Sequence, residues 1–204
     1  MYFIKKFTVK KIKLIVGLAN KGKEYTQTRH NVGSWYLKKL AKKYNQILKE
    51  EKKFLGYTTI INCCDSKLHL LIPSTFINFS GQSVAKIVNF YHIKSEEVLI
   101  VHDELDFVPG IAKFKIKSSY SGHNGIKNIS TELGLSFKFY RLRIGIGRPI
   151  NNEKINKFVL NKPSFFEKKL IDKSIDKAIN CTEDFLNNPL KAMDKLHAFK
   201  ASID

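Results

Sequence analysis

The sequence predicts an α/β fold, with a single domain whose twisted mixed β-sheet carries helices on both faces. The chain has 204 residues, 43% of them apolar, which is enough to bury one substantial core without disulfide bonds or metal ions. Apolar runs typical of strands alternate with segments of helical periodicity, and the polar stretches between them follow a strand or open a helix. We expect residues 1–12 to form an N-terminal extension and residues 13–204 to form the domain.

The first predicted strand covers residues 13–19, whose leucine and β-branched residues are typical of a buried strand. Ser34 is placed to cap the next helix, in which apolar residues recur at helical spacing: Trp35, Leu37, Leu40, Ala41, Tyr44 and Leu48. Residues 54–62 and 67–72 predict two strands joined by a hairpin turn at 63–66.

The alternation continues in the middle of the chain. The polar stretch 73–81 leads into a helix, and the apolar run 98–101 predicts a buried strand that ends in carboxylates. Residues 111–117 predict a strand with three lysines on one face: Lys113, Lys115 and Lys117. These ammonium groups suit a phosphate backbone, but an edge strand uses lysines in the same way to resist aggregation.

The last third contains a helix, a strand and a long helix. The stretch 121–125 precedes a helix that ends at Gly134, and residues 140–146 predict a strand in which Arg141 and Arg143 alternate with apolar residues. Residues 151–157 are predicted to be a polar connection. Ser164 and Glu167 then form a capping box for an amphipathic helix that reaches Phe185.

Basic residues outnumber acidic residues two to one. The 36 lysines and arginines against 18 aspartates and glutamates give a formal net charge of +18. Because such a field attracts polyanions, nucleic acid is the first expected partner. A lysine-rich coding bias or a general need for solubility is the alternative explanation.

Cysteine usage and hydropathy favour a cytoplasmic protein. Cys63 and Cys64 are adjacent and Cys181 is remote, so they form neither a C-x-x-C pair nor an even disulfide set. No apolar run approaches the ~20 residues of a membrane span, and the first residues lack the apolar segment of a signal peptide.

Residues 28–33 lie between the first predicted strand and the first predicted helix, and they include His30. Imidazole has an unperturbed pKa close to neutrality, so a histidine held in this position is suited to act as a general base. Asp103, at the end of a later strand, is suited to fix its tautomer and to stabilise the imidazolium. Taken alone, a histidine in a polar loop is more often a solvated surface residue, and an acid at a strand end is also an ordinary loop residue.

Two amides accompany this pair. Asn20 follows the first strand, where open α/β sheets bind ligands, and Asn78 offers a donor and an acceptor to a carbonyl group. Turn formation and helix capping are the alternatives. The glycine pattern at 17–22 fails as a dinucleotide fingerprint. A metal site is only weakly indicated, because no second cluster accompanies His102, Asp103, Glu104 and Asp106.

Six ordered blocks of the sequence resemble the bacterial-type peptidyl-tRNA hydrolases. The resemblance runs from Lys13 to the C-terminal helices, and its blocks are KLIVGLAN (13–20), Y-x-x-TRHN (25–31), FINFSG (76–81), HDELD (102–106), GHNG (122–125) and RLRIGIGRP (141–149). It implies hydrolysis of the ester that links a peptide to the terminal ribose of tRNA, which recycles the tRNA without a metal or cofactor.

The resemblance also implies roles for single residues. His30 looks like the base that activates water, Asp103 like the carboxylate that keeps it basic, and Asn20 like the amide that distinguishes peptidyl from unblocked aminoacyl esters. The positions that resemble substrate-binding and tRNA-binding residues are Tyr25, Phe76, Asn78, Lys115, His123, Asn124 and Arg143. We expect the loops around the histidine, the aspartate and the three asparagines to converge on one cleft.

The sequence departs from the family pattern at three places, and none of these departures removes a catalytic group. Lys21 stands where proline is usual, Ile77 where methionine is common, and residues 118–121 where the family is glycine-rich. The last departure leaves the shape of the loop before His123 open.

The alternative function is a non-catalytic basic module that binds tRNA or the ribosome. The asparagines and the His/Asp pair favour the enzyme, because a phosphate binder needs cations rather than neutral amides. The expected partner is peptidyl-tRNA. We expect a monomer that uses no cofactor or metal and does not associate with a membrane.

Overall fold

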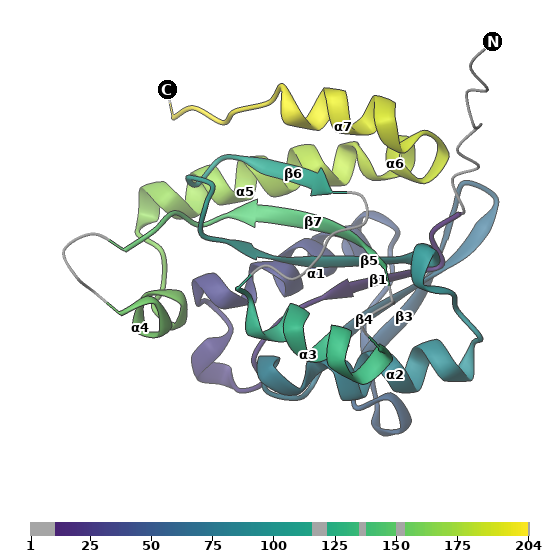
Figure 1. Cartoon of the computed structure of the whole chain (residues 1–204). Helices are drawn as coiled ribbons and strands as arrows, with labels where there is room; N and C mark the ends of the chain where they lie inside the picture. Colours follow the sequence, from purple (N-terminus) through teal and green to yellow (C-terminus); the bar gives the residue numbers. More distant parts are fainter. Residues whose placement is uncertain (1–10, 116–121, 135–137, 150–153, 204) are drawn as a thin grey trace, which may run out of the picture.

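The computed structural model describes residues 11–115, 122–134, 138–149 and 154–203 (Figure 1). A seven-stranded sheet with the order β2-β3-β4-β1-β5-β7-β6 forms its centre. Strands β4, β1, β5 and β7 run parallel, whereas β3 is antiparallel to β2 and β4, and β6 is antiparallel to β7. The strands are β1 (Leu14–Gly17), β2 (Lys49–Glu51), β3 (Gly56–Cys63), β4 (Ser66–Pro73), β5 (Val98–Glu104), β6 (Ala112–Lys115) and β7 (Tyr140–Gly145).

Helices cover both faces of this sheet, as the sequence predicts (Figure 1). They are α1 (Val32–Lys43), α2 (Ser80–Phe90), α3 (Asn124–Leu133), α4 (Ile155–Leu160), α5 (Phe165–Asn180), α6 (Thr182–Asn187) and α7 (Pro189–His197). The fold class is therefore confirmed: a mixed sheet in a single α/β domain.

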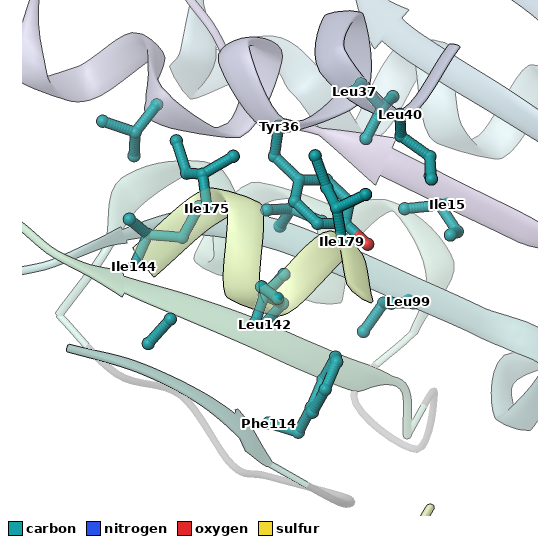
Figure 2. Close-up of a cluster of buried hydrophobic side chains, with 14 of the residues drawn as sticks. Ile15, Tyr36, Leu37, Leu40, Leu99, Phe114, Leu142, Ile144, Ile175 and Ile179 are labelled. Carbon is teal, nitrogen blue, oxygen red and sulfur yellow. The ribbon is translucent and has the colours of Figure 1, made fainter. Parts of the chain in front are cut away.

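The central strands are buried on both faces, so successive side chains enter two different cores. Ile15 of β1 belongs to a core that also contains residues of α1, α5, α6 and α7, whereas its neighbours Leu14 and Val16 belong to a second core with residues of α2 and α3. Figure 2 shows part of the first core, with Tyr36 of α1, Ile175 of α5 and Leu142 of β7 among its labelled side chains. Because both faces of these strands are buried, their sequences are continuously apolar and do not alternate between apolar and polar residues.

Helix α1 begins earlier than predicted. It starts at Val32 rather than after Ser34, whose hydroxyl donates to the carbonyl of Asn31 inside the first turn. The hairpin turn is also shorter than expected, because β3 and β4 extend to Cys63 and Ser66. The remaining two residues, Cys64 and Asp65, have φ values of 50° and 55°, the left-handed conformation that a two-residue hairpin turn requires.

The C-terminal third differs most from the prediction. A polar connection was expected over residues 151–157, but residues 155–157 are the first three of α4, which continues to Leu160. The capping box of Ser164 and Glu167 is confirmed, but its helix ends at Asn180, and Phe185 belongs to α6. Residues 118–121 and most of the predicted N-terminal extension lie outside the described residues, so the extension stays a prediction.

Two glycines let α1 lie directly against the ends of β1 and β5. A Cβ on Gly17 would be 2.4 Å from the carbonyl oxygen of Gly33, and a Cβ on Gly33 would be 2.4 Å from the carbonyl oxygen of Val101. The N–H of Leu18 donates to the same carbonyl of Val101 at 2.9 Å, which continues the pairing of β1 with β5. The close approach of α1 brings the residues just before it next to the carboxyl end of β5.

None of the helices in the described part of the chain combines the length and apolarity that crossing a lipid bilayer requires.

Candidate active site

The imidazole of His30 and the carboxylate of Asp103 meet at this junction. His30 is the middle residue of the short 3₁₀ helix η2 (Arg29–Asn31), and Asp103 is the penultimate residue of β5. Nδ1 of His30 lies 2.9 Å from Oδ1 of Asp103, and the two side chains are 13% and 3% exposed. Because the carboxylate accepts the hydrogen on Nδ1, the lone pair of the neutral ring is on Nε2. The ring is therefore oriented as a base.

Asp103 accepts a second imidazole hydrogen. Nε2 of His123 lies 2.9 Å from the same Oδ1, and the rings of His123 and His30 are 5.0 Å apart. Nδ1 of His123 accepts from the backbone N–H groups of Gly125 and Ile126, and so it caps α3. A ring nitrogen that accepts carries no hydrogen, so His123 is neutral and donates from Nε2.

Asp103 and His30 shift each other's pKa. Burial by itself lowers the pKa of His30, but the charge and hydrogen bond of Asp103 outweigh burial, and the net pKa is above 6.5. Burial by itself raises the pKa of Asp103, but the two histidines outweigh it and hold that pKa well below its usual range. The carboxylate is therefore ionised at neutral pH, and it strengthens His30 as a base.

His102 supports this group from inside the protein. Its Nδ1 donates to the main-chain carbonyl of Asp103 at 2.6 Å, and its ring packs edge-on against His123 with 4.9 Å between centroids. Burial lowers the pKa of His102 well below 6.5, and the positive charge of Arg141 lowers it further. His102 is therefore a neutral support of the aspartate backbone.

A cavity of about 220 Å³ lies next to the histidines. Asn124, the first residue of α3, is exposed and lines it beside His123, while α4 supplies part of the wall. Its lining includes His30, Asp103, His123, Asn124, Ile155, Asn156 and Val159. The cavity has room for a small acyl group or a few water molecules beside the base.

Asn20 is held by hydrogen bonds at its backbone and at its side chain. The Asn31 amide accepts from the N–H of Asn20 at 2.8 Å and donates to its carbonyl at 3.0 Å. Oδ1 of Asn20 accepts from the N–H of Ile77 at 2.8 Å, which fixes which end of the amide carries the NH₂ group. Asn20 thus connects η2 to the 3₁₀ helix η4 (Ile77–Phe79).

Three of the five predicted loops share one cavity. His30, Asp103 and Asn124 line the 220 Å³ cavity, but Asn20 lines a larger cavity of about 1100 Å³ whose lining also includes Asn31. Asn78, which is exposed on η4, lies outside the lining of the smaller cavity. Residues of η2 border both cavities, His30 the smaller and Asn31 the larger, and the convergence of Asn20 and Asn78 on the same cleft stays a prediction.

Phe76 and Tyr25 lie outside the lining of the smaller cavity. Phe76 is 47% exposed, and the ammonium of Lys21 is 5.3 Å from the centre of its ring. Tyr25 ends the 3₁₀ helix η1 (Lys23–Tyr25), is half-buried, and accepts from Thr28 through its carbonyl. Tyr25 therefore contacts the start of the stretch that contains His30, and Phe76 presents an accessible ring beside Lys21.

Lys115 and Arg143 lie on the edge of the sheet formed by β6 and β7. Lys115 is exposed, and it pairs in register with Arg141, which is 1% exposed although its position alternates with apolar residues. Arg143 is 17% exposed and donates through Nε to Glu104 at 2.6 Å. Partial burial and then the two arginines lower the pKa of Lys115. The edge concentrates positive charge, with Lys115 as its accessible group.

Arg29 connects the histidine turn to α4. Its guanidinium donates to the carbonyls of Phe158, Asn161 and Lys162 and to the carboxylate of Glu167, the last at 2.9 Å. The guanidinium also stacks on the ring of Phe158, 4.2 Å from its centre. The arginine is 7% exposed, so the residue before His30 is a buried anchor for the helix that lines the cavity.

Within the described residues, His30, Asp103 and His123 form a group whose ligand atoms all lie within 4.8 Å of one another. Two imidazoles and one carboxylate are donors that transition metals accept. Here, the same atoms are joined by N–H hydrogen bonds to Oδ1. The run after His102 does not converge in this way, because Glu104 binds Arg143 and Asp106 binds Arg148.

The sequence reasoning did not single out Arg29 or Asn31, although both lie in the stretch that contains His30. Polar residues directly before and after a candidate base indicate that hydrogen bonds from these neighbours fix its position. Their hydrogen-bond partners lie up to 138 residues away in sequence. The sequence around His30 therefore indicates which residues fix its position, but it does not indicate which residues they bind.

Comparisons with known proteins agree with this geometry. A sequence profile of the family described as peptidyl-tRNA hydrolase matches residues 14–203. A peptidyl-tRNA hydrolase of Yersinia pseudotuberculosis is 55% identical over 192 residues, which cover 94% of this chain and 98% of that protein. The peptidyl-tRNA hydrolase of Photorhabdus laumondii is 53% identical over 193 residues, with the same shares of each chain covered.

The fold also matches solved structures. The crystal structure of peptidyl-tRNA hydrolase from Acinetobacter baumannii superposes with a TM-score of 0.87 at 42% identity, over 93% of this chain and 96% of that one. Profile, sequence relatives and structure all span nearly the full chain. The chain therefore belongs to the bacterial-type peptidyl-tRNA hydrolase family.

Proposed function

We propose that this protein hydrolyses the ester between the peptide and the tRNA of peptidyl-tRNA, and so recycles tRNA. The observation that carries the proposal is the 2.9 Å bond from Nδ1 of His30 to a buried, ionised Asp103, which leaves Nε2 as a base beside a cavity. The relatives named peptidyl-tRNA hydrolase and the net charge of +18 support the same substrate.

In this mechanism Nε2 of His30 takes a proton from a water molecule whose oxygen attacks the ester carbonyl carbon. Asp103 stabilises the imidazolium that forms, as in other His/Asp pairs. The tetrahedral intermediate then breaks the bond to the ribose oxygen. That oxygen leaves with the bonding electron pair and receives the proton from the imidazolium, which restores the neutral base.

The neutral amides hold the substrate in this proposal. Asn124 lines the cavity beside His123 and is placed to bind water or the carbonyl oxygen. Asn20 has its carbonyl end occupied by Ile77, so its NH₂ end is the group offered to a peptide carbonyl. Asn78 holds the substrate next to it, while Tyr25 and Phe76 border the entry of the tRNA 3′ end. Lys115 and Arg143 are assigned to tRNA phosphates.

The first test is hydrolysis of N-blocked aminoacyl-tRNA by protein treated with a chelator to remove metal ions. The parental protein is expected to release deacylated tRNA. His30→Ala is expected to lose most of the turnover and to keep its affinity for tRNA, because the phosphate contacts lie elsewhere. Turnover at the parental rate by purified His30→Ala would return the protein to the alternative, a basic module that binds tRNA without chemistry.

The proposal extends to the setting of the enzyme. The three free thiols fit the reducing cytoplasm, which we propose as its location. We also propose a monomer that works without a resident metal ion, and a domain that covers residues 13–204 behind a short N-terminal extension. Light scattering and the chelator-treated assay test the oligomeric state and the metal requirement.

A further inference from the structure

Phe165 and Phe166 expose their rings at the start of α5. They are 68% and 63% exposed, more than any other aromatic side chain in the described part of the chain. Their ring centroids are 5.8 Å apart with 76° between the planes, so the rings meet edge to face and do not stack on each other. Exposing two adjacent phenylalanines is unfavourable for the free protein unless something covers them.

The surroundings of the two rings are basic. Residues 154–169 contain five lysines and one carboxylate, Glu167, and one of these lysines, Lys168, pairs with Asp172. Glu167 binds Arg29 and caps the helix through Ser164, so it does not offset the lysines freely. The ammonium of Lys169 lies 4.5 Å from the centre of the Phe165 ring. An apolar partner would gain binding free energy by covering the rings, but the positive charge of the lysines would add nothing to its binding.

The pair is also tied to the proposed active site. Arg29, the residue before His30, binds the carbonyl of Lys162 at 3.0 Å and Glu167 at 2.9 Å, on either side of the two phenylalanines in sequence. Helix α4, which lines the cavity, lies five residues before Phe165. A ligand on the rings would therefore be held at a fixed position relative to the base.

We propose that Phe165 and Phe166 form a stacking site for an unpaired base of the tRNA. Flat aromatic faces beside lysines fit a nucleotide, because the base stacks on the ring while its phosphate meets the ammonium groups. The inference rests on the proposed function, since it names a further contact for the same substrate. It assigns the rings to substrate binding and gives them no part in the chemical step.

The test compares two double variants with the parental protein. Phe165→Leu/Phe166→Leu keeps apolar side chains but removes the aromatic faces, and Phe165→Trp/Phe166→Trp keeps them. With N-blocked aminoacyl-tRNA, the leucine variant is expected to raise KM about tenfold with kcat within twofold of the parental value, whereas the tryptophan variant keeps the parental KM. A blunt duplex RNA, which lacks unpaired bases, should bind the parental and leucine proteins equally.

Phe90→Leu is the matched control. Phe90 is 57% exposed and has the ammonium of Lys53 4.7 Å from its ring, but it lies at the end of α2 and packs against Phe54. Its KM should stay at the parental value, which would show that losing an exposed phenylalanine does not itself weaken binding.

Two results would overturn the stacking site. One is a leucine variant with the parental KM in a protein that hydrolyses the substrate. The other is a tryptophan variant that binds as weakly as the leucine variant. A parental protein that binds tRNA with the expected dependence on the two rings, but never cleaves the ester, would support the stacking site and overturn the proposed function.

Discussion

At the scale of single residues, one carboxylate oxygen organises the candidate site. Oδ1 of Asp103 accepts from both His30 and His123, and the backbone of Asp103 accepts from His102. His123 is locked as a neutral donor by its bonds to the start of α3, so it orients the carboxylate without competing for the proton that His30 takes up. The two histidines therefore have different roles around one acceptor.

Replacing Asp103 with asparagine tests the electrostatic part of this arrangement. The asparagine oxygen is still able to accept both N–H groups, but the negative charge is lost, so turnover should fall by less than in His30→Ala. Activity of a neutral base rises with pH through the pKa of His30, which Asp103 holds above 6.5. Without the charge of Asp103, nothing opposes the effect of burial, so the pKa of His30 falls and the rising limb should move to lower pH. The measurement is kcat/KM against pH.

Asp106→Asn serves as the control for this pH profile. It removes one negative charge from the same loop, but Asp106 is bound to Arg148 rather than to His30. Its rising limb should stay at the parental position. A limb that stays in place in Asp103→Asn, or moves to higher pH, would contradict the pairing of His30 with Asp103.

The His30 and Asp103 pair could be predicted because each residue is next to a strongly patterned segment. A strand end and a helix start are visible in sequence, and topology then brings the polar residues after them to one edge of the sheet. The bond from His123 to Asp103 was not predictable in the same way, because it depends on the orientation of α3. The burial of Arg141 was also missed, since it contradicts the alternation of its strand.

At the scale of elements, the position of α4 depends on Arg29. This six-residue helix forms part of the cavity wall, and it is too short to be stable by itself. The guanidinium binds three carbonyls at its end and the carboxylate at the start of α5. The sequence predicted a polar connection here because six residues give too little periodicity, and a distant arginine supplies the stabilisation that local pattern does not.

Arg29→Lys tests whether this anchor positions the cavity wall. A single ammonium keeps the charge opposite Glu167 but does not match the planar, forked set of donors that contacts the carbonyls. We expect KM to rise several-fold and the rising limb of the pH profile to stay unchanged, because Asp103 still holds His30. The thermal midpoint should also fall, by the loss of buried hydrogen bonds worth ~1–3 kcal/mol.

Glu167→Gln is the companion variant, because it keeps a hydrogen-bond acceptor for Arg29 and leaves the carbonyl contacts in place. Its KM should lie closer to the parental value than that of Arg29→Lys. If Arg29→Lys lowers the thermal midpoint but leaves KM at the parental value, then Arg29 stabilises the fold without positioning the wall of the cavity.

At the scale of the whole molecule, the excess positive charge of +18 is not spread over equivalent groups. Several lysines are paired with carboxylates on the surface, such as Lys43 with Glu183 and Lys195 with Asp184. Lys115 differs because its cross-strand neighbour is Arg141 and because Arg143 also lowers its pKa, while Glu104 acts in the opposite direction. A cluster of cations is unfavourable for the free protein and becomes favourable when an anion binds.

The salt dependence of tRNA binding distinguishes a phosphate contact at Lys115 from charge that serves only solubility. Each phosphate that a cation neutralises adds ~0.7–0.9 to the slope of log affinity against log salt. Lys115→Ala should therefore flatten the slope by about that amount while turnover at saturating substrate stays near the parental value.

Arg143 is a less suitable probe, since its removal leaves the partly buried Glu104 without its partner. Lys86→Ala on α2, where the lysine is exposed on another face of the sheet, is the control and should leave the slope unchanged. Equal slopes for the parental protein and Lys115→Ala would mean that this edge of the sheet does not contact the tRNA backbone, and the lysines of β6 would then be explained as protection of an edge strand.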